Sequence, residues 1–194
     1  MDEAERKIYR RRSLRLPGYD DSQPGAYFVT VVTHGRPCLF GEVVDGEMIL
    51  NAAGKVVEAA WRDLPVHYPG VELGAFCILP NPIHAIIILV DMGTKIIPVV
   101  EAGLRPASTA AKNYPLSEIV RAFKSFSARR INQIGNTPGQ PVWQRNDYEH
   151  ILRNDDDYRL IHLYIQASPA RWPRFFSDLR PFPAACARRP DPVC

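Results

Sequence analysis

The chain has 194 residues, which suits one domain with a substantial hydrophobic core that needs neither disulfides nor a structural metal. Hydrophobic residues make up 46% and charged residues 23%, as in an ordinary soluble globular protein. The net charge of +3 is too small to identify a nucleic-acid-binding protein by itself. No stretch is long and apolar enough to span a bilayer, and the N-terminus has no apolar signal core, so we expect a cytoplasmic protein.

The four cysteines are scattered along the chain. No two of them have the spacing of a zinc site or a redox motif; they are Cys38, Cys77, Cys186 and Cys194. This distribution predicts unpaired thiols in a reducing cytosol.

Positive charge is concentrated in an N-terminal arm, residues 1–25. The basic side chains of this arm include Arg10, Arg11, Arg12 and Arg15. Arms of this kind neutralise phosphates and give salt-sensitive affinity with little sequence preference. A solvated terminus without any partner has the same composition, so the charge alone leaves both interpretations open.

The first half of the chain alternates strand and helix signals. Residues 26–33 are rich in β-branched and aromatic residues and predict a strand. Residues 42–44 and 48–50 predict a hairpin around the Asp45-Gly46 turn. A helix is expected from Asn51 or Ala52 to about Leu64, where Pro65 ends it.

Two further strands are predicted at residues 71–79 and 83–90. The second is too apolar for a water-facing edge and indicates the centre of a sheet. The linking Pro80-Asn81-Pro82 must interrupt the pairing because proline supplies no backbone donor. The pattern fits either a hairpin or one strand with a kink.

The second half predicts a loop, two helices and a short strand. Residues 91–114 have loop composition, and residues 116–133 have apolar side chains at helical spacing. A short strand is expected within 142–151, followed by a helix capped by Asn154 or Asp155 that ends at about Ala167, before Pro169. A proline-rich basic tail, 173–194, follows. The order of elements favours an α+β fold with an antiparallel sheet.

His84 lies at the start of the most apolar strand, directly after the proline turn. A rigid strand there could hold an imidazole as a metal ligand or a general base. A histidine that is merely tolerated at a strand end is the simpler explanation of this position alone.

Blocks along nearly the whole chain, residues 10–175, resemble one family, the REP-associated and insertion-sequence single-tyrosine transposases of the HUH superfamily. The blocks are, in chain order, residues 12–17 with 27–33, residues 79–84, residues 116–132, and residues 143–165. The resemblance implies a ferredoxin-like sheet, similar to an RNA-recognition sheet, in a domain that spans residues 26–172.

The resemblance also implies a chemistry. A tyrosine on the last helix, here Tyr164, attacks single-stranded DNA and forms a 5′-phosphotyrosine, while Mg²⁺ or Mn²⁺ polarises the phosphate. His84 matches one metal-binding histidine of the family, but the other histidine position holds Pro82 and the third ligand position holds Ser168. Asn81 is the nearest replacement ligand, although residues three apart on a regular strand face opposite sides. Tyr148 is the alternative nucleophile.

The expected partner is single-stranded or hairpin DNA, and the family often acts as homodimers. Positively charged, hydrogen-bonding or stacking side chains are the candidates for contacting it: the four arginines of the arm, Lys124, Arg129, Trp143, Arg145, Tyr148 and His150. Trp143 and Tyr148 could stack on unpaired bases, and packing against the sheet is the alternative, equally favoured for Trp143.

Two functional hypotheses follow from the family resemblance. One is a transposase that cleaves and transfers DNA strands through Tyr164. The other is a catalytically impaired DNA-binding protein, favoured by Pro82 and Ser168. An unrelated α+β enzyme that uses His84 with a carboxylate is a third reading, and no acidic residue has a spacing that supports it.

Overall fold

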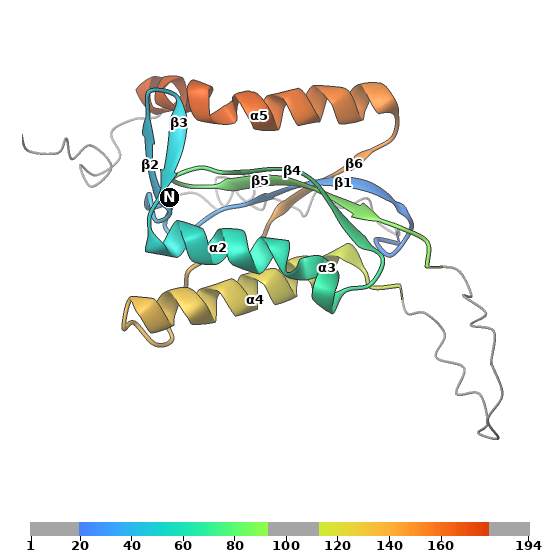
Figure 1. Cartoon of the computed structure of the whole chain (residues 1–194), viewed down its shortest axis with the longest axis horizontal. Helices are drawn as coiled ribbons and strands as arrows, with labels where there is room; N and C mark the ends of the chain where they lie inside the picture. The colour runs from blue at the N-terminus through green and yellow to red at the C-terminus, as the bar shows by residue number, and fades with distance from the viewer. Residues whose placement is uncertain (1–19, 93–112, 179–194) are drawn as a thin grey trace, which may run out of the picture.

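The computed structural model describes residues 20–92 and 113–178 (Figure 1). Most of the expected N-terminal arm, most of the predicted loop at residues 91–114, and the tail beyond residue 178 lie outside the described residues. In the described part of the chain, no helix is both long and apolar enough to cross a membrane.

A four-stranded antiparallel sheet forms the centre of the molecule. Its strand order is β4 (Val71–Ile78), β5 (Ile83–Leu89), β1 (Gly25–Val31) and β6 (Tyr148–Leu152). The two central strands are therefore β5 and β1, as the uninterrupted apolar sequence of β5 indicates.

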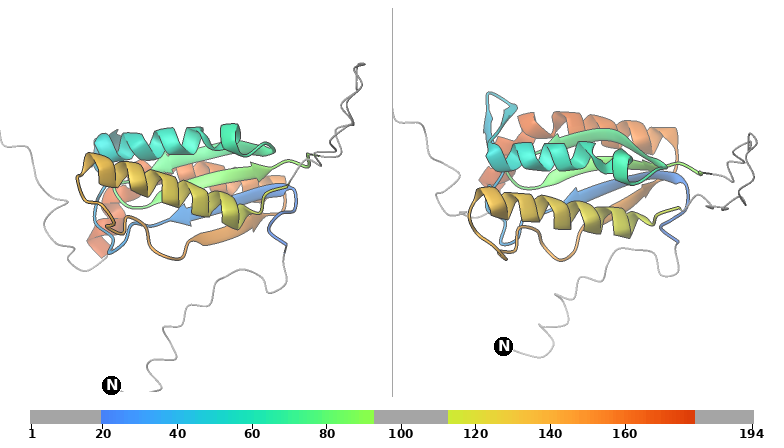
Figure 2. Two further views of the ribbon diagram at one scale, coloured as in Figure 1. Left: turned by 90° about the horizontal axis from the view of Figure 1, so that it is seen from below. Right: turned by 60° about the horizontal axis from the view of Figure 1, so that its bottom comes forward.

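Helices cover both faces of the sheet. The helices α2 (Ala52–Arg62), α3 (Leu64–His67) and α4 (Leu116–Ile134) lie on one face, and α5 (Asp155–Asp178) crosses the other (Figure 1). Figure 2 shows α2 and α4 side by side against the sheet. This arrangement confirms the predicted α+β class.

The first hairpin forms where the sequence predicts it. Strands β2 (Gly41–Val44) and β3 (Glu47–Leu50) pair around Asp45 and Gly46, which have φ angles of 52° and 84°. Two successive positive φ angles are typical of the tight turns that join twisted antiparallel strands, and Asp-Gly accepts them readily.

The second hairpin settles the alternative left open by the proline turn. β4 and β5 pair as antiparallel neighbours, and the Leu79 N–H donates to the Pro82 carbonyl at 2.9 Å. The Asn81–Pro82 peptide bond is cis. Residues 71–90 are thus a hairpin and not one kinked strand.

Two helix ends differ from prediction. The helix expected to reach about Leu64 ends at Arg62 as α2, and a separate helix, α3, begins at Leu64 with Pro65 in its first turn, where a missing N–H costs nothing. The prediction that the last helix ends at Ala167 is wrong, because α5 runs through Pro169 to Asp178 and so includes the start of the predicted tail. Packing on the sheet and on the β2–β3 hairpin compensates for the hydrogen bond that Pro169 removes.

Cys38 is disulfide-bonded, so the prediction of unpaired thiols is wrong for this residue. Spacing along the chain does not report which thiols the fold brings together. Cys77 is a free thiol, and its burial raises its pKa to about 11.

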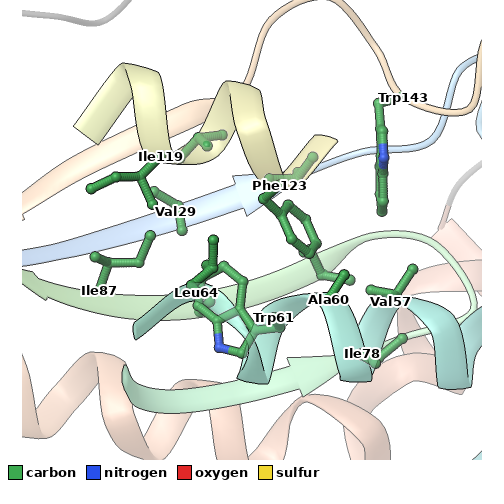
Figure 3. Packing of buried hydrophobic residues seen from close by; sticks show 14 of the residues in the cluster. Val29, Val57, Ala60, Trp61, Leu64, Ile78, Ile87, Ile119, Phe123 and Trp143 are labelled. Carbon is green, nitrogen blue, oxygen red and sulfur yellow. The ribbon is translucent and has the colours of Figure 1, made fainter. Parts of the chain in front are cut away.

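The main core lies between the sheet and the α2–α4 layer (Figure 3). Trp61 of α2 stacks on Phe76 with ring centroids 5.0 Å apart and meets the ring of Phe123 edge-on at 5.4 Å. Trp143 packs against Phe123 and Phe40 at the end of this core. Aromatic rings therefore pack against the sheet face that α2 and α4 cover, and α5 packs on the opposite face.

Asn51 caps α2 and also ties it to the preceding loop. Its Oδ1 accepts from the Gly54 N–H at 3.0 Å, and its Nδ2 donates to the Leu39 carbonyl at 3.0 Å. We expect Asn51→Ala to lower the free energy of unfolding by about 1–2 kcal/mol, since a helix end loses its cap. Urea denaturation measures this, with Asn51→Asp as the control that keeps the capping oxygen. An unchanged midpoint in Asn51→Ala would contradict the capping role.

Candidate functional site

The face of the sheet under α5 brings His84 and Tyr164 together. Because side chains alternate along a strand, His84 and Phe28 point toward α5 while their neighbours join the main core. The His84 Nδ1 lies 2.9 Å from the Thr30 Oγ1, and its Nε2 lies 3.4 Å from the Tyr164 hydroxyl. The Phe28 ring stacks on the imidazole at 5.8 Å and meets the Tyr164 ring edge-on at 6.1 Å.

The His84 imidazole is neutral at physiological pH. Burial lowers its pKa to about 4, and only 8% of the residue is exposed. A neutral imidazole has one N–H donor and one acceptor nitrogen, and its two neighbours here are hydroxyl groups that can act in either role. The site therefore holds His84 in place by two hydrogen bonds without needing a charge.

The Tyr164 phenol keeps its proton more firmly than a free tyrosine. Burial raises the pKa of Tyr164, an effect that the Ser168 side chain and then the nearby Arg171 guanidinium partly offset. Because a phenol must lose its proton to attack phosphorus, this environment does not activate Tyr164.

The side chains present do not fit a divalent metal ion. Pro82 has no donor atom, and the Ser168 hydroxyl is buried and donates to the Tyr164 carbonyl at 2.7 Å. The Asn81 Oδ1 accepts from the Thr33 N–H at 3.1 Å, so Asn81 does not replace the missing ligand. Among residues 20–92 and 113–178, no three His, Cys, Asp or Glu side chains form a group that could hold a metal. His84 alone would bind Mg²⁺ or Mn²⁺ weakly.

Comparison with known proteins identifies a similar sequence and similar solved structures. No family model matches the chain. An uncharacterized protein of Haemophilus influenzae is 36% identical over 172 residues, which cover 85% of this chain and 91% of that protein. The two proteins belong to one family. A solved REP-associated tyrosine transposase, bound to a REP hairpin, matches 89% of this chain and 74% of its own with a TM-score of 0.50 at 21% identity.

The chain has the transposase fold. A candidate transposase of Deinococcus radiodurans R1 also matches, with a TM-score of 0.42 and 18% identity over 77% of this chain and 92% of that one. The likeness to the REP-associated tyrosine transposase agrees with the α+β prediction.

Two predicted DNA contacts have other partners within this transposase fold. The Trp143 indole is 8% exposed and donates from Nε1 to the Ser127 Oγ at 3.0 Å, which favours packing over stacking. The Lys124 ammonium contacts the Arg145 carbonyl at 3.0 Å and the Asp147 carboxylate at 3.2 Å. Lys124 therefore adds no uncompensated charge to the surface.

The other candidates are spread over two faces. Arg145 is exposed in the segment before β6, and Tyr148 and His150 are exposed on β6, on the side of the sheet that carries Tyr164. Arg129 is exposed on α4, across the sheet from Tyr164 (Figure 1). Arg10, Arg11, Arg12 and Arg15 lie outside the described residues.

Sequence reasoning missed the residues that support the site. Thr30 and Phe28 of β1 position the imidazole, and Arg171 lies close enough to Tyr164 to act on its pKa. Alternation along β1 places Thr30 and Phe28 on one face, but only the pairing of β1 with β5 shows that His84 shares it.

Proposed function

We propose that this protein binds hairpin or single-stranded DNA and that its tyrosine site does not carry out metal-dependent cleavage. The bound REP hairpin of the REP-associated tyrosine transposase supports a DNA partner of this class. The exposed side chains Arg145, Tyr148 and His150 supply charge and ring surface for it, with Arg129 and the arginines of the arm as further phosphate contacts.

The observation that carries the absence of cleavage is the donor set around His84. Pro82 has no ligand atom, and the side-chain oxygens of Ser168 and Asn81 are both engaged with the backbone. A tyrosine nuclease of this kind needs a cation to polarise the phosphate. His84 remains as a single ligand, which is too few for Mg²⁺ or Mn²⁺.

Proton transfer within the His84–Tyr164 pair does not compensate. Phenol and imidazole differ by about 3.5 pKa units even when unperturbed, so the transfer costs about 5 kcal/mol. Burial raises the pKa of Tyr164 and lowers the pKa of His84 to about 4, and both shifts increase this cost. His84 is therefore a hydrogen-bond partner of Tyr164 and not its general base.

A second candidate function is DNA strand transfer through a 5′-phosphotyrosine on Tyr164. One observation favours it, because the Tyr164 hydroxyl lies 3.4 Å from the His84 Nε2, so nucleophile and histidine are still neighbours. Formation of a covalent adduct separates this candidate from the first.

Binding is tested by native gel shifts with a labelled DNA hairpin over a series of salt concentrations. We expect an affinity that falls steeply with salt, because phosphate contacts release counterions. Arg145→Ala should lower the slope of log affinity against log salt by about 1. The control is Arg62→Ala, an exposed arginine on α2 that pairs with Glu58 at 2.7 Å and should leave the slope unchanged. A wild-type protein that gives no shift, or a shift indifferent to salt, would refute DNA binding.

A further inference from the structure

The strand β6 presents two rings on the face that α5 covers elsewhere. Tyr148 and His150 are alternate residues and so point to the same side, and they lie opposite Thr30 and Phe28 in the pairing with β1. On this face Phe28 of β1 and Ile86 of β5 are buried, whereas Tyr148 is 42% exposed and His150 is also exposed. The cover provided by α5 therefore includes Leu152 at the end of β6 but leaves Tyr148 and His150 of this edge strand open.

The exposed rings adjoin the tyrosine site directly. The Phe28 ring meets Tyr148 edge-on with centroids 6.1 Å apart, and it meets Tyr164 edge-on at the same distance. One buried ring thus separates the exposed Tyr148 from the Tyr164 phenol. Contact with Phe28 fixes one side of the Tyr148 ring and leaves the remainder open to a ligand.

We infer that Tyr148 and His150 form a stacking platform for two successive unpaired bases of the DNA segment next to Tyr164. This inference rests on the proposed DNA binding and specifies that unpaired bases are the part of the DNA that contacts β6. Alternate strand residues lie about 7 Å apart, and RNA-recognition sheets use aromatic strand residues to stack two or three bases.

The charges around β6 favour a nucleic acid as the occupant. Arg145 precedes the strand and Arg153 follows it, and both are exposed, so each end can contact a phosphate. The Asp147 carboxylate is paired with Lys124 and adds little repulsion. The three aspartates that open α5, Asp155 to Asp157, would repel phosphates and so limit the platform on that side.

The test compares a blunt DNA hairpin with hairpins that carry a 5′ or a 3′ unpaired thymidine tail, by fluorescence anisotropy. Wild-type protein should prefer one tailed hairpin. Tyr148→Ala should reduce this preference by about 5- to 150-fold, the range for one lost base stack, and Tyr148→Phe should retain most of it. His150→Ala should reduce it in the same direction.

The matched control is Phe126→Ala. Phe126 is 39% exposed, similar to Tyr148, but it lies on α4 under the Arg130 guanidinium. Its loss should leave the tail preference unchanged. Circular dichroism checks that each variant is folded.

Several outcomes would overturn the inference. Equal losses for blunt and tailed hairpins in Tyr148→Ala would show that Tyr148 does not read unpaired bases. A wild-type protein that binds hairpins without any tail preference would leave the proposed function standing and remove the platform. If β6 instead pairs with a second copy of the chain, size-exclusion chromatography shows a dimer that Tyr148→Ala disrupts, and the platform is again refuted. If no hairpin binds at all, both the function and the platform fail.

Discussion

The double variant Pro82→His, Ser168→Asn should bind Mn²⁺ far more tightly than the wild-type protein. It adds an imidazole two residues before His84 and an amide oxygen one helical turn after Tyr164, where the wild-type chain has no free donor. Even the loss of a group that only orients a ligand costs about 10- to 100-fold in metal affinity. Two added ligands should therefore tighten Mn²⁺ binding by at least about 100-fold, which electron paramagnetic resonance of free Mn²⁺ measures.

The matched control is Pro82→Ala, Ser168→Ala, which makes the same backbone changes and adds no ligand. It should bind Mn²⁺ as weakly as the wild-type protein. Equal gains in both double variants would show that the effect comes from loop relaxation. No gain in the histidine–asparagine variant would show that these two positions are not the defect.

The burial of His84 should make the protein progressively less stable as pH falls from about 6.5 toward 4. The folded state lowers the pKa of His84 from 6.5 to about 4, so in this window the unfolded chain binds a proton that the folded chain refuses. The stability that neutral His84 contributes is complete above pH 6.5 and is lost below it. The loss amounts to about 2 kcal/mol at pH 5 and about 3 kcal/mol near pH 4, from 1.36 kcal/mol per pKa unit.

Urea denaturation at several pH values measures this effect as a difference between proteins. Carboxylates also titrate below pH 5, so the wild-type protein is compared with His84→Gln, which lacks the ionisation and keeps an amide hydrogen-bonding group. The difference in free energy of unfolding between wild type and His84→Gln should change by about 3 kcal/mol from pH 7 to pH 4. His34→Gln, at an exposed histidine, should follow the wild-type curve. Parallel curves for wild type and His84→Gln would contradict the buried, neutral state of His84.

Much of the fold could be predicted from local patterns, because those patterns and the tertiary structure agree. Asp45-Gly46 fits a turn with two positive φ angles, and the apolar run after Pro82 becomes the central strand β5. The Asn154 Oδ1 accepts from the Asp157 N–H at 2.8 Å, as expected for the cap of the last helix. Each of these signals acts over a few residues and needs no knowledge of distant contacts.

The sequence-based predictions fail where contacts between residues far apart in the chain determine the local structure. Pro169 is a helix breaker by local rules, but α5 packs along the sheet and the β2–β3 hairpin and continues through it. Trp143 is an aromatic residue of the kind that stacks on bases. In the structure it instead packs against Ser127 and Phe123, which precede it by 16 and 20 residues. A single sequence does not report such packing.

The candidate site could also be predicted only in part from the sequence. The resemblance to the single-tyrosine transposases paired His84 with Tyr164 across 80 residues, and the structure places the two side chains in contact. The reasons why a metal does not fit became complete only with the structure, because they depend on the hydrogen bonds that engage Ser168 and Asn81. The ring of Phe28, which links Tyr148 to Tyr164, could not be placed without the strand register.

The most direct measurement is a search for a covalent protein–DNA adduct. Purified wild-type protein and its Tyr164→Phe variant are incubated with a labelled tailed hairpin and Mn²⁺, and the products are resolved on denaturing and native gels. We predict a salt-sensitive shift on the native gel for both proteins and no adduct on the denaturing gel for either. An adduct that forms with wild-type protein and is lost in Tyr164→Phe would contradict the account and establish Tyr164 as a working nucleophile.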